Sequence, residues 1–193
     1  DLAGAEVDVA RMDGYLHCFA RALRPLAAQR AYDFILLDCP PSLGILTMNA
    51  LTAADCMLVP IQCEYYALEG LSVISSLVQQ LRESGANARI RIEGILMTMY
   101  DVRTNLSGQV VEEVRRHFGD RVYDALIPRN VRLSEAPSYG RPVIQYDQHC
   151  AGALAYRALA EEFLARAVGG SRVSPVDPAP APAVPPRPGD PDG

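Results

Sequence analysis

Asp38 is the residue whose type and position point most directly to chemistry. Residues 34–37 are Phe, Ile, Leu and Leu, an apolar run without alternation that is typical of a strand covered on both faces. Asp38 then ends the predicted strand 33–38, at the edge where open α/β sheets bind their ligands. Beside a phosphate-binding loop, this carboxylate would hold Mg²⁺ through water. The alternative is an acid that caps the next helix, and this stretch alone does not decide between the two.

The phosphate-binding loop that this chemistry needs is not found in the sequence. The pattern G-x-x-x-x-G-K-[ST] requires a lysine for the β- and γ-phosphates, but all 18 basic residues are arginine. No two glycines are five positions apart, and no G-x-G-x-x-G occurs. Since the chain begins at Asp1 and not at a methionine, we expect the loop to lie upstream in a longer protein, of which this chain is the carboxyl-terminal part.

Composition narrows the class of protein. With 193 residues, 49% hydrophobic and 21% charged, the chain is expected to be soluble and cytoplasmic, with one buried domain. No apolar run approaches 18 residues, and the start has no signal-peptide pattern. The five cysteines form no C-x-x-C pair and are interpreted as reduced, mostly buried thiols. A net charge of −5 argues against coating of nucleic acid or anionic membrane, but not against a local basic patch.

Hydrophobic periodicity predicts strands that alternate with helices. Pro25 is expected to bend or interrupt the first helix. The alternation predicts an α/β fold with a mostly parallel sheet flanked by helices. The predicted helices cover residues 14–30, 45–54, 67–85, 106–118 and 150–167, the strands cover 33–38, 55–61, 90–99 and 121–127, and a polar loop covers 128–142.

The composition changes sharply after Val168. Residues 171–193 hold eight of the fifteen prolines and almost no large apolar side chains. Such a segment buries too little surface to offset its chain entropy, so we predict a domain over 1–168 and a disordered, partly polyproline II tail over 169–193. The tail is interpreted as solvated, with docking of a partner as the less favoured alternative.

Several stretches together resemble one protein family. The sequences YDFILLDCPPSLGILTMNALTAADCMLVPIQCEYYALEGL, RIEGILMTMYDVRTNLSGQVVEEV and LIPRNVRLSEAPSYGRPVIQYD are similar to the ParA/Soj family of chromosome- and plasmid-partitioning ATPases, relatives of MinD. The resemblance runs in order from about Leu2, in LAGAEVDV, to Ala167. It implies an incomplete deviant Walker P-loop NTPase fold, because the family's loop K-G-G-x-G-K-[ST] and its next acidic motif have no counterpart in this chain.

The resemblance also assigns roles to residues. Asp38 matches the family's acid behind Mg²⁺, a catalytic and metal position. The segments TMYDVRTN and IPRNV resemble the loops that border adenine and ribose, which makes Met99, Asp101, Pro128 and Asn130 candidate ATP-binding residues. From the residues alone, these segments would be interpreted as ordinary turns.

Arginines in the same loops resemble the family's nonspecific DNA contacts. Arg103 and Arg132 match best, and the alternative is that they pair with Asp101 and Glu135 as solvated ion pairs. The family implies an ATP-bound homodimer, nonspecific DNA, a ParB-like DNA-binding partner, a nucleoid-associated location and no membrane. Two other functions stay open: a non-catalytic interaction protein that keeps the scaffold, and a MinD-like membrane-associated regulator. Without the loop lysine, we expect no ATP hydrolysis by this chain alone.

Overall fold

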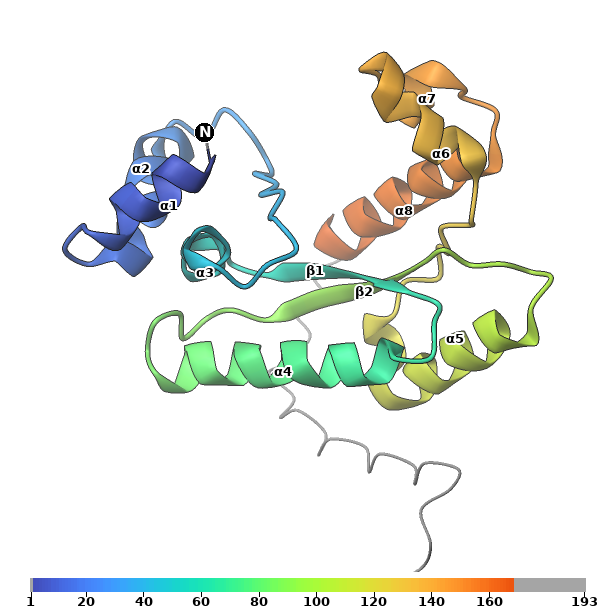
Figure 1. Ribbon diagram of the computed structural model, residues 1–193, viewed down its shortest axis with the longest axis horizontal. Coiled ribbons are helices and arrows are strands. Elements are labelled where there is room, and N and C mark those ends of the chain that lie inside the picture. The colour runs from blue at the N-terminus through green and yellow to red at the C-terminus, as the bar shows by residue number, and fades with distance from the viewer. Residues whose placement is uncertain (1, 169–193) are drawn as a thin grey trace, which may run out of the picture. The chain divides into compact units, whose positions relative to one another are not determined.

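The computed structural model describes residues 2–168, and the predicted tail 169–193 lies outside the described residues. Eight α-helices, three 3-10 turns and two strands follow one another in this part of the chain (Figure 1). They are α1 (Leu2–Ala10), η1 (Tyr15–His17), α2 (Cys18–Ala28), α3 (Ile45–Ala53), β1 (Met57–Gln62), α4 (Ala67–Glu83), β2 (Ile92–Thr98), α5 (Asn105–Phe118), η2 (Gly119–Arg121), α6 (Val131–Glu135), η3 (Ala136–Tyr139), α7 (Val143–Tyr146) and α8 (Ala151–Val168).

The chain divides into two compact units. The first contains residues 1–59 and 76–94, and the second contains 60–75 and 95–193. In the first unit, α3 contacts α1, η1 and α2. In the second, α6 and α7 contact each other and α8 (Figure 1). No described helix is long and apolar enough to cross a membrane.

Strands β1 and β2 form a parallel pair, as the sequence predicts. The N–H of Met57 donates to the carbonyl of Arg91 at 2.8 Å, and further along both strands the N–H of Cys63 donates to Thr98 at 2.9 Å. Hydrogen bonds that advance together along two strands mark a parallel ladder. Helix α4 connects the two strands, so β1, α4 and β2 form a β-α-β motif.

The predicted strand 121–127 is only partly correct. This segment follows β2 in parallel, with bridges between Ile95 and Val122 and between Tyr100 and Pro128, but it forms no continuous strand. The interruption has a physical cause in α8. The carboxylate of Glu162 accepts the N–H groups of Asp124 and Ala125, both at 3.0 Å, so these groups do not join a ladder.

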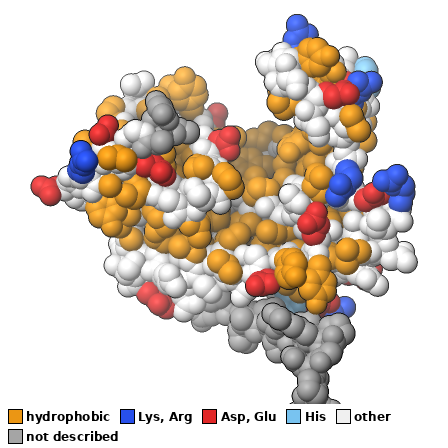
Figure 2. Space-filling model, in the orientation of Figure 1, with side chains coloured by type: hydrophobic (Ala, Val, Ile, Leu, Met, Phe, Trp, Pro, Cys, Tyr) orange, Lys and Arg blue, Asp and Glu red, His pale blue; other side chains and the backbone are white. Residues whose placement is uncertain are grey.

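The predicted strand 33–38 is wrong. Residues 31–40 have no regular secondary structure, and Phe34, Ile35 and Leu36 are 44%, 40% and 83% exposed. A strand exists only with a neighbour that completes its hydrogen bonds, and no ladder or bridge of the described residues includes this stretch. Hydrophobic side chains also reach the surface elsewhere, as the face in Figure 2 shows.

The predicted helices are confirmed with small shifts at their ends. The largest shift is in the first helix, where residues 15–17 form a 3-10 turn before α2, and Pro25 lies inside α2. The polar loop 128–142 is wrong in part, because α6 and η3 form within it. All five cysteines are free, but only Cys63 is buried, so the prediction of mostly buried thiols is wrong.

The core of the second unit lies between the sheet and α8. Leu96 of β2, Tyr123, Ile127 and Leu159 of α8 form a buried cluster, with Phe163 packed against it. Tyr123 is fully buried, and the guanidinium of Arg166 lies 4.0 Å from the centre of its ring. This packing fixes the segment beside β2 and therefore the two loops that follow β2 and Pro128.

Candidate functional site

The two loops with candidate nucleotide-binding residues lie side by side at the carboxyl end of β2. Tyr100 donates its N–H to the carbonyl of Ile127 at 3.0 Å and accepts the N–H of Arg129 at 2.9 Å. These bonds make a parallel bridge between Tyr100 and Pro128, so the loop that begins at Met99 runs beside the loop that carries Pro128 and Asn130. Carboxyl ends of parallel strands are the usual ligand-binding edge of such sheets.

Met99 has a backbone conformation that side chains rarely adopt. Its φ of +56° lies in the left-handed region, directly after the last residue of β2. For a residue other than glycine this conformation carries strain, and such strain occurs often at functional sites. The turn directs the chain from the sheet into the loop 99–104.

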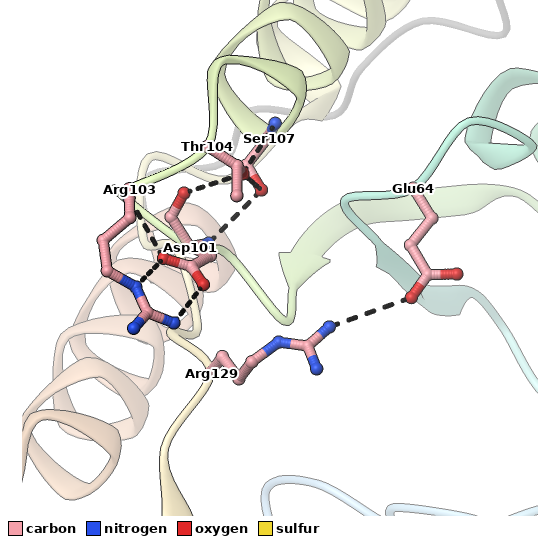
Figure 3. A network of polar contacts seen from close by, with 6 residues as sticks. All are labelled: Glu64, Asp101, Arg103, Thr104, Ser107 and Arg129. Atoms are coloured by element: carbon pink, nitrogen blue, oxygen red, sulfur yellow. Dashed lines mark hydrogen bonds and ion pairs between the residues drawn. The ribbon is translucent and has the colours of Figure 1, made fainter.

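The carboxylate of Asp101 organises that loop. Its Oδ1 accepts the N–H of Arg103 at 3.0 Å and the Nε of Arg103 at 2.9 Å, and Oδ2 accepts Nη2 at 2.7 Å (Figure 3). The hydroxyl of Thr104 donates to the carbonyl of Asp101 at 3.1 Å, and Ser107 accepts the N–H of Asp101 at 3.3 Å. Four residues therefore hold one another in a fixed arrangement.

Hydrogen bonds from the Arg103 side chain and backbone, together with its charge, hold the pKa of Asp101 well below the ordinary value of about 3.8. The charge of Arg129 acts weakly in the same direction. Asp101 is therefore an anion at every physiological pH, with a side chain only 16% exposed. A carboxylate in this state accepts hydrogen bonds and donates none, so it suits a hydroxyl group as partner.

Asn130 has a structural role that the sequence reasoning missed. Its Oδ1 accepts the N–H of Arg132 at 2.9 Å and so caps the start of α6. Asparagine is among the best N-cap residues, which is the sequence signal for this helix. The amide NH₂ is not part of the cap, since the cap uses the oxygen alone. Arg129, between Pro128 and Asn130, has its Nη2 4.0 Å from Oε1 of Glu64.

Both arginines predicted to contact DNA are paired with acids. Arg103 binds Asp101 as described, with 81% of its side chain exposed. Arg132 places Nη1 2.8 Å from Glu135 and Nε 3.5 Å from Asp147, with 52% of its side chain exposed. The solvated ion pairs that the sequence offers as the alternative are therefore present.

Asp38 belongs to the first unit, and the other candidate residues belong to the second. It is exposed, at the end of the irregular stretch 31–40. The segment that follows is attached to α3, since the Thr47 hydroxyl donates to the carbonyl of Ser42 at 2.7 Å. Within residues 2–168, no group of three or more His, Cys, Asp or Glu side chains could hold a metal. One exposed carboxylate fits an ion such as Mg²⁺ that keeps most of its waters.

Comparisons with known proteins agree on one family. A family model described as an AAA domain matches residues 1–92. The chain is 50% identical over 166 residues to the chromosome partitioning protein ParA of Caulobacter vibrioides. The aligned region covers 86% of this chain and 62% of that protein. The chain is 52% identical over 164 residues to the sporulation initiation inhibitor protein Soj of Bacillus subtilis, and the aligned region covers 85% of this chain and 64% of that protein. The chain thus spans less than two thirds of the length of either relative.

Solved structures share the fold. A cobyrinic acid a,c-diamide synthase from Mycobacterium smegmatis with bound ADP and magnesium superposes with a TM-score of 0.69 and 33% identity, covering 88% of this chain and 61% of that one. The cell division ATPase MinD of Pyrococcus furiosus gives a TM-score of 0.60 at 24% identity, covering 77% and 58%. The predicted α/β fold of the P-loop NTPase type is confirmed.

Proposed function

Because this chain belongs to the ParA/Soj family of partitioning ATPases, we propose that it acts in the segregation of a chromosome or plasmid. In this proposal it is the carboxyl-terminal part of an ATP-dependent dimer that binds DNA nonspecifically and responds to a ParB-like DNA-binding partner. The support is identity of about half over nearly the whole described chain. The observation that carries the site is the backbone pairing of Tyr100 with Ile127 and Arg129.

In this proposal the paired loops hold the base and ribose of ATP. Met99 and Pro128 supply apolar surface for a purine, and the Asn130 amide supplies a directed donor. The ionised Asp101 carboxylate accepts a hydrogen bond from a ribose hydroxyl. Asp38 would hold Mg²⁺ through water, and the ion would supply positive charge for phosphate oxygens.

A substitution at Asn130 tests the base-side role without loss of the helix cap. Asn130→Asp keeps an oxygen that accepts the N–H of Arg132, because aspartate caps helices as well as asparagine does. It removes the amide donor. The substitution is made in a chimaera that joins the amino-terminal part of the Bacillus subtilis relative to this chain, and ATP affinity is measured by calorimetry with Mg²⁺.

We expect ATP affinity to fall about tenfold, the cost of one buried hydrogen bond left unmade. Asn130→Ser, which also keeps a capping oxygen but lacks the amide group, should match it. Unchanged affinity in both variants would remove Asn130 from the site. The 193-residue chain itself has no lysine and is expected to release no phosphate above background. Mg²⁺-dependent turnover by that chain would contradict this expectation.

The proposed DNA contacts are Arg103 and Arg132. Both are exposed, and an exposed ion pair contributes little energy, so exchange of a carboxylate for a phosphate costs little. In the chimaera with ATP, each alanine variant should weaken binding equally on unrelated duplexes and reduce the salt slope by about one unit. Arg157→Ala, on the exposed surface of α8, is the matched control. Equal salt slopes in the two arginine variants and the control would exclude Arg103 and Arg132 from the DNA contact.

A further inference from the structure

Two neighbouring tyrosines are exposed in the loop that follows β1 in the second unit. Tyr65 is 68% and Tyr66 is 71% exposed. Their rings meet edge to face with centroids 5.2 Å apart, which fixes one ring relative to the other. Cys63 at the start of the loop is buried and bonded to β2, and Ala67 at its end is buried at the start of α4. The pair is therefore held on a rigid base.

Carboxylates flank the tyrosine pair. Glu64 precedes it with 59% of its side chain exposed, and its Oε1 lies 4.0 Å from Nη2 of Arg129, which makes a long ion pair. Glu69 lies three residues after Tyr66, exposed in the first turn of α4. An aromatic surface with acids beside it has the chemistry of surfaces that bind proline-rich peptides carrying a basic residue.

The chain itself contains such a peptide. Residues 182–188 read PAVPPRP, with prolines at 182 and 185 in the P-x-x-P spacing and Arg187 two residues further. Proline fixes φ near the polyproline II value, so little conformational entropy is lost when such a segment binds. We propose that Tyr65 and Tyr66 bind residues 182–188 of the same chain, with the prolines against the rings and Arg187 beside Glu64 and Glu69.

The segment is long enough to reach the tyrosines. The last turn of α8 is joined to the sheet by Arg166, whose Nη2 donates to the carbonyl of Val122 at 3.0 Å, and Val122 bridges to Ile95 of β2. The loop that carries the tyrosines is joined to β2 at Thr98, whose carbonyl accepts the N–H of Cys63 at 2.9 Å. Three residues along β2 and two strand spacings across the sheet are each about 10 Å. The fourteen residues from Val168 to Pro182 span about 43 Å as polyproline II, which exceeds the needed path.

A photo-crosslinker in the tail tests the proposal on the full 193-residue chain. Val184→p-benzoylphenylalanine places the reactive group between the prolines, and crosslinked peptides are identified by mass spectrometry after irradiation. We expect crosslinks within one chain to residues 63–70, at a yield independent of protein concentration. The double variant Tyr65→Ser/Tyr66→Ser should lower that yield about tenfold, the typical effect of a central tyrosine in a small interface.

Matched variants separate this contact from nonspecific collapse. Tyr139→Ser removes a tyrosine that is 66% exposed and stacked on Tyr146, and should leave the yield unchanged. Arg187→Glu should lower the yield, and Glu69→Arg in the same chain should restore it. Crosslinks only between copies, crosslinks scattered over the surface, or a yield that the tyrosine double variant leaves unchanged would each overturn the proposal.

Discussion

Glu162 replaces a β-ladder where the segment beside β2 is interrupted, so its removal should destabilise the second unit. Its carboxylate accepts the N–H groups of Asp124 and Ala125 at 3.0 Å and binds Nη2 of Arg166 at 2.6 Å. A hydrogen bond to a charged group contributes about 1.5–3 kcal/mol. The Asp124 N–H regains water in a variant, and Arg166 keeps its bond to Val122, so we expect Glu162→Ala to cost about 2–3 kcal/mol in total.

The neighbouring Glu161 provides the control for this prediction. It lies on the same helix, is exposed, and undergoes the same change of helix propensity when replaced by alanine. Urea denaturation of both variants gives the midpoints and slopes, and Glu161→Ala should stay within about 0.5 kcal/mol of the parent. Equal losses in both variants would show that the carboxylate does not substitute for the missing strand pairing.

The same contact should depend on pH. Burial raises the pKa of Glu162, but the two backbone N–H donors and Arg166 lower it by more, so the pKa lies below its ordinary value of about 4.5. A group with a lowered pKa in the folded state stabilises fully above the unfolded value and loses this effect as pH falls through the folded value. The difference in stability between the parent and Glu162→Gln should therefore be full well above the ordinary pKa of about 4.5 and should shrink as pH falls below that value. A stability difference that stays constant with pH would show that the ionisation of Glu162 does not contribute to it.

Two further predictions concern packing and association. Gly152→Ala places a methyl group 2.6 Å from Cγ of Leu133 and should destabilise the fold by about 1–3 kcal/mol in urea. Because Leu133 packs against the buried cluster of the second unit, Leu133→Ala has a cost of its own. Gly152→Ala should therefore cost less in the Leu133→Ala background than in the parent, and an equal cost in both would contradict the reasoning. The exposed run at Phe34 and Leu36 should make the 193-residue chain self-associate, and Leu36→Ser should raise the monomer fraction in size-exclusion chromatography, whereas a monomeric parent would refute this expectation.

Local periodicity predicted most helices, because each buries one face at a repeat that the sequence displays. Helix α4 is an example, because its buried residues Ala67, Leu71, Val78 and Leu81 follow one another at spacings of four, seven and three residues, which places them on one face. The prediction of a strand at 33–38 was wrong because an apolar run predicts burial but not the neighbouring strand that a strand requires. The interruption at Asp124 was not predictable locally, since its cause, Glu162, lies 38 residues further along the chain.

The sequence named the residues of the candidate site, but it did not indicate how they are connected. The resemblance named Met99 and Pro128, and the Tyr100 bridge brings their loops together. The left-handed turn at Met99 has no signal in a methionine, which rarely adopts it. The hydrogen bond that Ser107 accepts from the N–H of Asp101 could have been inferred from the sequence. Thr104 is a good N-cap residue, so it predicts that α5 starts there and that Ser107 lies in its first turn, next to the loop.

The pairing of Arg103 with Asp101 is compatible with a DNA contact. The pair uses Nε and Nη2, and a guanidinium has two further N–H donors on Nη1 that can bind a phosphate at the same time. Asp101 would then position Arg103, because a held side chain loses less entropy on binding than a mobile one. Asp101→Asn, titrated with DNA at saturating ATP, decides between the two effects. Weaker binding identifies Asp101 as a positioning residue, whereas tighter binding shows that the carboxylate competes with the phosphate.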